Sequence, residues 1–335
     1  MSALPMSALP DSNGLLILPR IRVQNANAIS SPITHGFPSI TAFLGLQWAL
    51  ERKLLGKFPV VFDSIGVVCH DYEEQTAKGG YTKSFCLTRN PIEKDGSTAA
   101  IVEEGRIHLD ITLLLGISGG CIPDFTEDER AAFAYEVAET VARMRIAGGS
   151  VVPGRHGARG KPQLVLVPLS TDAAEANNEF RLLRRRWLPG FALVSRDDLL
   201  ARRWESLKKN NPRATKFDAL LDLSRLNWRP GPAADANDPQ KTVEWLPERK
   251  DGWIVPMPVG YGALAQFQAG AVEQARDLRA PFSFVESLYS AGQWISPHRL
   301  GSWRDLLWYG RADTETGLYR ACNDYVQPTT VELPY

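Results

Sequence analysis

Hydrophobic and polar positions alternate most regularly along residues 106–115. Ile107, Leu109 and Ile111 are apolar, whereas His108 and Asp110 between them are polar. A period of two is typical of a β-strand that has one buried face and one wet face. We therefore expect a strand here whose polar side meets solvent or a ligand.

Residues 127–146 follow the helical period instead. Phe133 and Val137 lie four positions apart on one apolar stripe, and Thr126 with Glu129 has the spacing of a capping box. The same reasoning predicts other elements along the chain. Strands are expected over 15–23, 60–70, 81–87 and 164–167, and helices over 39–53 and 175–187 and from Ser195 onward.

The order of these elements, β-α-β-β…β-α-β, favours an α+β domain of the ferredoxin-like or RNA-recognition (RRM-like) type with insertions. Turn-forming residues between 71 and 105 predict a protruding hairpin. The predicted organisation is a disordered leader (1–12), an RRM-like core (13–172), a basic helical segment (173–228), a linker (229–240) and a β- and aromatic-rich part that packs on the core (241–335).

Composition narrows the class of protein. Of the 335 residues 44% are hydrophobic and 23% are charged, which excludes a disordered low-complexity chain. No stretch approaches the roughly 18 consecutive apolar residues of a membrane-spanning helix. The four cysteines have no C-x-x-C pair and no histidine at ligand spacing, so neither a structural metal nor a disulfide framework is expected. We expect a cytoplasmic protein without a cofactor or a membrane partner.

Basic side chains are concentrated between residues 181 and 216. This stretch holds eleven Lys and Arg and three acidic residues, a local charge of +8 in a chain with no net charge. Arginine donates two parallel hydrogen bonds to phosphate, so such a face suits nucleic acid, but it equally suits an acidic protein or plain solvent. The candidate basic face consists of Arg181, Arg184, Arg185, Arg202, Arg203, Lys208 and Lys209.

Two motifs resemble enzyme signatures. Residues 116–120 match G-x-S-x-G, with Ser118 as nucleophile, His298 as base and residues 35–38 as an oxyanion loop, which would make a serine hydrolase. The preceding strand alternates, however, whereas the motif requires a buried parallel strand. Residues 260–265 match the dinucleotide pattern G-x-G-x-x-A, but prolines precede them and we expect a loop there.

The polar loop at 24–37 follows the first predicted strand and precedes a helix N-terminus. Its mixed donors and acceptors suit single-stranded RNA, and Phe37 would supply a stacking face. Asn and Ser side chains also satisfy their own backbone in turns, and the residues alone favour that interpretation.

Eight sequence blocks resemble a known family. The longest reads LILPRIRVQNANAISSP (16–32), and the resemblance runs from about residue 15 to about residue 320. The other blocks are 87–91, 95–106, 145–150, 188–196, 219–223, 296–299 and 305–309. The chain resembles the type I-F CRISPR-associated Csy family, specifically its second subunit.

This resemblance implies a RAMP-superfamily protein with an RRM-like core and a thumb-like extension, for which 71–105 is the candidate. It implies a subunit that binds the 5′ handle of crRNA, pairs with the large Csy subunit at the tail of the surveillance complex and abuts the multi-copy backbone subunit. The complex pairs its guide with double-stranded target DNA, and this subunit is not expected to cleave it. A protein-only adaptor is the remaining alternative.

The resemblance also implies RNA-contacting residues. The loop would read the handle while nearby arginines bind phosphates, the thumb would bring its own residues near the RNA, and glycines would allow a close approach of backbone to nucleotides. Aromatic RRM signatures are absent, so binding should rely on loops and hydrogen bonds. The implied residues are Arg20, Arg22, Gln24, Asn25, Asn27, Ser30, Ser31, His35, Phe37, Arg89, Asn90, Gly148, Gly149 and Ser150. The basic face would meet RNA, the DNA duplex or the large subunit.

Overall fold

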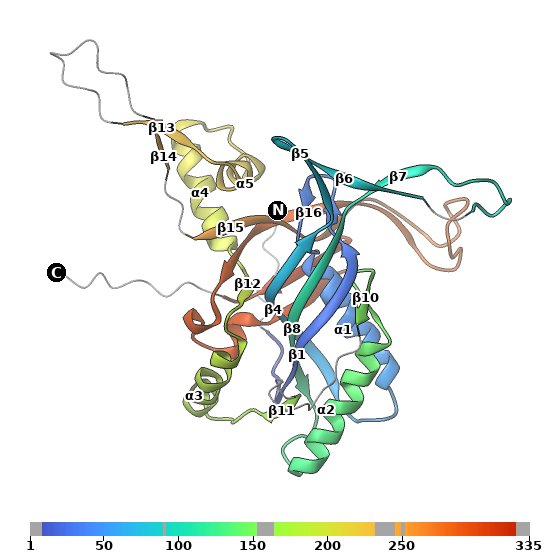
Figure 1. Ribbon diagram of the computed structural model, residues 1–335, viewed down its shortest axis with the longest axis vertical. Coiled ribbons are helices and arrows are strands. Elements are labelled where there is room, and N and C mark those ends of the chain that lie inside the picture. The colour runs from blue at the N-terminus through green and yellow to red at the C-terminus, as the bar shows by residue number, and fades with distance from the viewer. Residues whose placement is uncertain (1–8, 90–91, 153–163, 232–244, 249–251, 326–335) are drawn as a thin grey trace.

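A computed structural model describes residues 9–89, 92–152, 164–231, 245–248 and 252–325 (Figure 1). These residues form a mixed α+β fold with five α-helices, which confirms the expected class. One large antiparallel sheet has the strand order β12-β16-β15-β18-β17-β4-β8-β1-β10-β9, and β11 also pairs with β1.

Six strands make up the first part of this sheet, and two helices pack on it. In the order β11/β10-β1-β8-β4, every neighbouring pair is antiparallel, and helices α1 and α2 connect its strands. Both helices bury apolar side chains against one face of the sheet. The elements are β1 (Gly14–Asn27), α1 (Ile40–Leu54), β4 (Val61–Glu74), β8 (Arg106–Ser118), α2 (Glu127–Ala142), β9 (Arg145–Ile146), β10 (Gly149–Val152) and β11 (Val165–Pro168).

Local signals account for the ends of the two helices. Ser39 caps α1 by accepting a hydrogen bond from the backbone N–H of Thr41, and Thr126 with Glu129 forms the expected capping box at α2. Helix α2 ends at Ala142, earlier than its periodicity predicts, because a tight β9–β10 hairpin follows. Its two central residues, 147 and 148, both have positive φ, the geometry of a type I′ turn.

Among the described residues, the second face of the sheet is covered at one end only. Leu15, Ile17 and Leu114 are buried there beneath an apolar layer that includes Phe180 and Trp187. Farther along β1 the same face carries arginine and glutamine, and no apolar layer of the described residues covers it. The covering elements are α3 (Ala173–Leu183), β12 (Phe191–Ser195) and the short 3₁₀ helices η1 (Arg184–Trp187), η2 (Pro297–Arg299) and η3 (Trp303–Leu306).

Residues 71–105 include the end of β4 and, before β8 begins, a separate three-stranded sheet that projects from the body (Figure 1). Antiparallel pairing joins β5 to β6 and β6 to β7. A smaller hairpin, β2 with β3, lies between β1 and α1. The bounds are β2 (Ile29–Ser31), β3 (Thr34–His35), β5 (Thr76–Gly79), β6 (Thr82–Arg89) and β7 (Ile101–Glu104).

The C-terminal strands continue the same sheet. The dinucleotide-like segment 260–265 lies inside strand β15, so the expectation of a loop there is wrong. Pro256 and Pro258 pair with β16 on one side only, because β18 reaches β15 only at 260–262, and an unpaired edge tolerates proline. These strands are β15 (Trp253–Phe267), β16 (Phe282–Ile295), β17 (Trp308–Asp313) and β18 (Leu318–Asn323).

A helical lobe stands beside β15 and β16 (Figure 1). Its first helix begins at Asp197, and the expected cap by Ser195 is wrong, because Ser195 is buried in β12 while Asp198 binds Arg196. Only the start of the expected linker, 229–231, is described. The lobe consists of α4 (Asp197–Asn210), α5 (Lys216–Ser224), β13 (Trp228–Pro230) and β14 (Trp245–Pro247).

The end of the expected leader is packed against the body. Leu9 is buried and its backbone N–H donates to Asp324, and Asp11 pairs with Arg304. Residues 9–12 therefore do not form the disordered leader that the sequence suggested, and residues 1–8 lie outside the described part. None of the helices that the structure describes is both long enough and apolar enough to cross a membrane.

Candidate nucleic-acid interface

The open face of the sheet is shaped by two bulges in β1. Its register with β8 shifts between Leu18 and Ile21 and again between Val23 and Ala26. Arg20 and Asn25 lie in these bulges with φ near +55°. A bulge turns side chains away from the regular alternation, and both residues are exposed in the second half of a strand whose first half is buried.

Arg20 is held at the head of a hydrogen-bonded chain. Its guanidinium lies 3.4 Å from a carboxylate oxygen of Asp110, and its backbone N–H donates to Thr112 Oγ1. His70 Nε2 lies 2.8 Å from the same hydroxyl, and His70 Nδ1 donates to the carbonyl of Pro189. Burial lowers the pKa of His70 below its ordinary 6.5, so the ring is neutral at pH 7. The Thr112 hydroxyl therefore donates to Nε2, and the chain fixes the backbone at Arg20.

Arg22, Gln24 and Ser150 form an exposed polar row beside Arg20. Gln24 lies opposite Ser150 in the β1–β10 ladder, and Arg22 lies opposite Asp110 in the β1–β8 ladder. Within the described part of the chain, Arg22 has no ion pair. The structure thus brings together four residues that the sequence predicted, and leaves one guanidinium open to a ligand.

Asn25 belongs to a second polar group, on the side of the projecting β5–β6–β7 sheet. Its backbone N–H donates to His108 Nδ1 over 3.1 Å, and its side-chain oxygen accepts from Gln75 Nε2 over 2.6 Å. Gln75 Nε2 also lies 2.9 Å from His108 Nε2. His108 is therefore used to support the bulge at Asn25, a role that the wet face of its strand allowed.

The remaining polar residues of the loop hold its own shape. Asn27 makes two hydrogen bonds with the backbone of Ile29, Ser30 donates to the Phe37 carbonyl, and Ser31 is paired with Thr34. These contacts agree with the interpretation in which the Asn and Ser side chains satisfy the backbone of their own turn. For Asn27, Ser30 and Ser31 the side-chain oxygens thus have partners within the protein.

The two glycines at the β9–β10 hairpin differ in surroundings. A Cβ on Gly149 would lie 2.7 Å from the backbone of Gln24 and Ala26, so this glycine is required by the packing of β10 on the second bulge. Gly148 is exposed with φ +79°, and no described atom lies within 4 Å of its Cβ position. A close approach of RNA backbone therefore stays a prediction for Gly148.

A cavity of about 440 Å³ lies along residues 69–74 of β4, next to the polar face. His70 lines this cavity and also reaches the polar face through Thr112. The predicted loop contributes His35 and Phe37. Phe37 stacks on Phe43 and lies nearly perpendicular to Trp294, so one of its faces is covered within the protein, and its role as a stacking face for RNA stays a prediction. The opposite wall, which sequence analysis missed, consists of Phe191, Leu193, Trp253, Val255, Met257 and Trp294.

Arg89 is exposed at the end of β6 in the projecting sheet, and Asn90 lies outside the described residues. His35 connects the loop to this sheet, because its ring lies 5.0 Å from the ring of Phe85. The projecting sheet and the loop are therefore in contact, whereas Arg89 lies at the far end of its strand.

The predicted basic face is not one continuous charged surface. Arg184 turns inward and donates to the carbonyl of Leu300, and burial together with Arg181 and Arg185 lowers its pKa. Arg202 pairs with Asp198. Lys208 pairs with Glu205 and lies 4.0 Å from the ring centre of Trp204. Arg181, Arg185 and Lys209 remain exposed.

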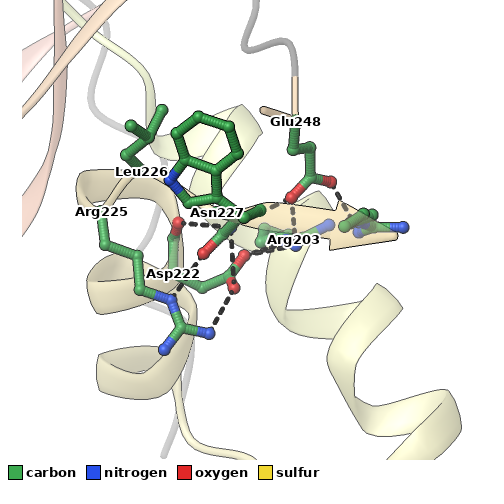
Figure 2. A pocket seen from close by; sticks show the side chains of 8 residues that line it. Arg203, Asp222, Arg225, Leu226, Asn227 and Glu248 are labelled. Carbon is green, nitrogen blue, oxygen red and sulfur yellow. Dashed lines mark hydrogen bonds and ion pairs between the residues drawn. The ribbon is translucent and has the colours of Figure 1, made fainter. Parts of the chain in front are cut away.

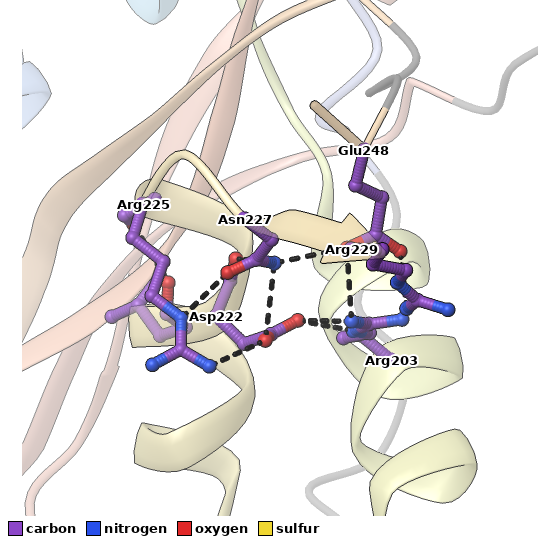
Figure 3. Close-up of polar contacts among 8 residues, drawn as sticks. Arg203, Asp222, Arg225, Asn227, Arg229 and Glu248 are labelled. Carbon is purple, nitrogen blue, oxygen red and sulfur yellow. Dashed lines mark hydrogen bonds and ion pairs between the residues drawn. The ribbon is translucent and has the colours of Figure 1, made fainter. Parts of the chain in front are cut away.

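Arg203 is the centre of a structural ion-pair cluster. It lines a cavity of about 370 Å³ between α4, α5 and the β13–β14 hairpin (Figure 2). Its guanidinium meets Asp222 and lies 3.8 Å from Glu248. Arg225 binds Asp222 and Asn227, and Arg229 binds Glu248 over 2.6 Å (Figure 3). Arg203 thus serves the packing of the lobe and is removed from the candidate basic face.

Replacing Asp222 by asparagine is expected to lower the free energy of unfolding at pH 7 by about 3 kcal/mol, because two arginines lose a partly buried partner. Although burial opposes it, hydrogen bonds from Arg203 and Arg225 hold the pKa of Asp222 below 3.8. The stabilisation is therefore complete above the unfolded-state pKa and is lost as the pH falls through the folded-state pKa. Urea unfolding at pH 7 and at stepwise lower pH measures both effects.

Asp277 provides the matched control, because it pairs with Arg279 on an exposed loop. Asp277→Asn should leave stability at pH 7 nearly unchanged. A difference between wild type and Asp222→Asn that stays constant as the pH drops well below 3.8 would contradict the assignment.

The serine-hydrolase arrangement does not form. Strand β8 is antiparallel to both β1 and β4, so Ser118 does not end a parallel strand. The Ser118 side chain forms a hydrogen bond with Asp63, whereas His298 Nδ1 lies 2.8 Å from Ser296 Oγ, so each has a different partner from the one that the motif requires. Across the described ranges no group of three or more His, Cys, Asp or Glu side chains is arranged to hold a metal ion.

Comparison with known proteins gives matches over most of the chain. A family model described as CRISPR-associated protein (Cas_Csy2) matches residues 16–321. The chain is 45% identical over 318 residues to CRISPR-associated protein Csy2 of Pseudomonas aeruginosa (strain UCBPP-PA14). This alignment covers 93% of the chain and 96% of the relative.

Proposed function

Because the chain belongs to the Csy2 family of CRISPR-associated proteins, of the type I-F system, we propose that it binds the 5′ handle of crRNA within a surveillance complex. The observation that carries the proposal is the open polar face of the sheet. Arg20, Arg22, Gln24 and Ser150 lie side by side there, and the guanidinium of Arg22 has no ion pair within the described ranges.

The chemistry of this face suits a single RNA strand. Arginine binds phosphate through two parallel hydrogen bonds, while amide and hydroxyl groups exchange hydrogen bonds with base edges and 2′-hydroxyls. These groups are carried by hydrogen-bonded strands of the sheet and not by a free loop, which lowers the entropy lost on binding.

The arrangement of the core supports a RAMP-type protein. The strand order β11-β1-β8-β4, with α1 and α2 on one face, is the order of a ferredoxin-like fold. The projecting β5–β6–β7 sheet is the candidate thumb, and it lies at the same end of β4 and β8 as the polar face.

The proposal assigns partners as well. The chain pairs with the large Csy subunit and touches the multi-copy backbone subunit, and through the complex it supports recognition of double-stranded DNA. The exposed charges of Arg181, Arg185 and Lys209 are available for one of these contacts. The role is structural and not catalytic.

The test is binding of the purified chain, with and without the co-expressed large subunit, to handle RNA and to a scrambled-handle control at two salt concentrations. Handle-selective binding is expected at both salts. Equal and strongly salt-dependent binding of the two RNAs would remove sequence recognition from this chain, and lack of binding in either form would overturn the proposal.

A further inference from the structure

Three aromatic side chains around the 440 Å³ cavity are neither buried nor fully exposed. Tyr72, Phe191 and Trp253 are 50%, 44% and 47% exposed, and all three line the same cavity. Phe191 and Trp253 meet edge to face at 5.7 Å between ring centres. The free energy of leaving large rings half in water is recovered when a flat apolar group covers them.

The cavity lies beside an unpaired edge. On its outer side β4 pairs with β17 at Ile65 and with β12 at Val68 and Cys69, and among the described residues no strand follows from His70 to Glu74. A chain that crosses the polar face therefore reaches the cavity around this edge. Burial raises the pKa of Cys69 to about 12, so the neutral thiol adds to the apolar lining.

The polar groups of the cavity suit the edge of a nucleobase. Asp71 and Glu74 line it. Glu74 Oε2 is paired with Lys83 over 3.0 Å and Asp71 Oδ1 accepts from the backbone N–H of Tyr72, so the second oxygen of each carboxylate is left to accept a hydrogen bond from the amino group of a base. His35 adds a further polar group from the loop side. Aromatic walls with acceptors between them match a base, which has apolar faces and a polar edge.

We propose that this cavity holds one nucleobase turned out of the bound RNA strand, with Trp253 as its stacking surface and Asp71 and Glu74 at its edge. The volume is within the range of about 300–1,000 Å³ of small-ligand sites and accommodates a single base with part of its sugar. The inference rests on the RNA-binding function proposed above, and it adds a base-specific site to the phosphate-binding face.

The test couples protein and RNA changes in a double-mutant cycle. Handle RNAs that each carry one abasic nucleotide are bound to the full chain and to its Trp253→Ala variant. With wild type, one abasic position should weaken binding about 10- to 100-fold, the effect of losing one stacked base. The Trp253→Ala variant should bind intact RNA more weakly by a similar factor, and its affinity should not fall further when that position is abasic. The Trp253→Phe variant should recover most of the affinity, because it keeps an aromatic ring.

Trp48→Ala is the matched control, because Trp48 is an exposed tryptophan on α1 outside the cavity, and it should change neither quantity. If wild type binds handle RNA but no abasic position is coupled to Trp253, the cavity proposal fails while the RNA-binding function stands. If Trp253→Ala no longer binds the large subunit, and no abasic position is coupled to Trp253, the cavity would instead hold a side chain of that subunit. Lack of RNA binding by wild type overturns both.

Discussion

Replacing Arg20 and Arg22 together by glutamine is expected to weaken binding to handle RNA by about 50-fold at low salt, since two charge-assisted contacts to phosphate are lost. Each neutralised phosphate releases counterions, and single strands lose about 0.7 in the slope of log K against log salt per contact. The double variant should therefore have a slope smaller in magnitude by about 1.4. Fluorescence anisotropy over a salt series measures both quantities.

The substitution is designed to leave the fold unchanged. Arg20 has a positive φ, and glutamine meets the same backbone strain there as arginine does. Its backbone N–H still donates to Thr112, so the bulge keeps its support. Only the guanidinium groups are removed. In the ion pair of Arg20 with Asp110 the arginine is 45% exposed and the aspartate 23%, so its loss is expected to cost about 1 kcal/mol of stability, and urea unfolding of the double variant checks that the fold is kept.

A second double variant, Arg52→Gln with Arg143→Gln, is the matched control. Both arginines are exposed on or next to the helical layer that covers the opposite face of the sheet. It removes the same net charge, so it isolates the general electrostatic term. Equal losses in the two double variants would show that the polar face acts only through net charge, and would contradict the assignment of Arg20 and Arg22.

Local patterns predicted the elements that frame the site. Period-two alternation located β8, and capping residues located the starts of α1 and α2, because these signals depend on neighbours within a few positions. The alternation also showed that His108 and Asp110 lie on one face. Which of the loop residues face outward was not predictable, because the bulges in β1 shift the alternation and leave no signature in composition.

The cavity could not be predicted, because its walls are distant in sequence. His35, Phe191 and Trp253 come from three elements that meet only when β12, β15 and β16 join the sheet. The partners of Arg203 were missed for the same reason. Arg203 is neutralised by Asp222 and Glu248, which lie 19 and 45 positions away, so a charge count along the chain overestimated the free basic surface.

Trp308→Ala is expected to lower the free energy of unfolding by about 5 kcal/mol, because Trp308 fills the junction between the two parts of the sheet. It is buried, and its backbone makes the only described β17–β4 pairing, with Ile65. Its indole N–H donates to the buried carbonyl of Leu193 over 2.8 Å. Truncation of a buried tryptophan to alanine typically costs 3–5 kcal/mol, and an unpaired buried carbonyl adds about 1–3 kcal/mol.

Urea unfolding followed by circular dichroism separates these contributions. Trp308→Phe keeps most of the volume but lacks the donor, so it should lose only about 2 kcal/mol. Trp48→Ala removes an exposed tryptophan and should stay within about 0.5 kcal/mol of wild type. A loss below about 2 kcal/mol for Trp308→Ala would mean that β17 is not what joins the C-terminal strands to the core. In that case the wall of the cavity would depend on β12 alone, which pairs with β4 at Val68 and Cys69 and forms the other connection between the two parts.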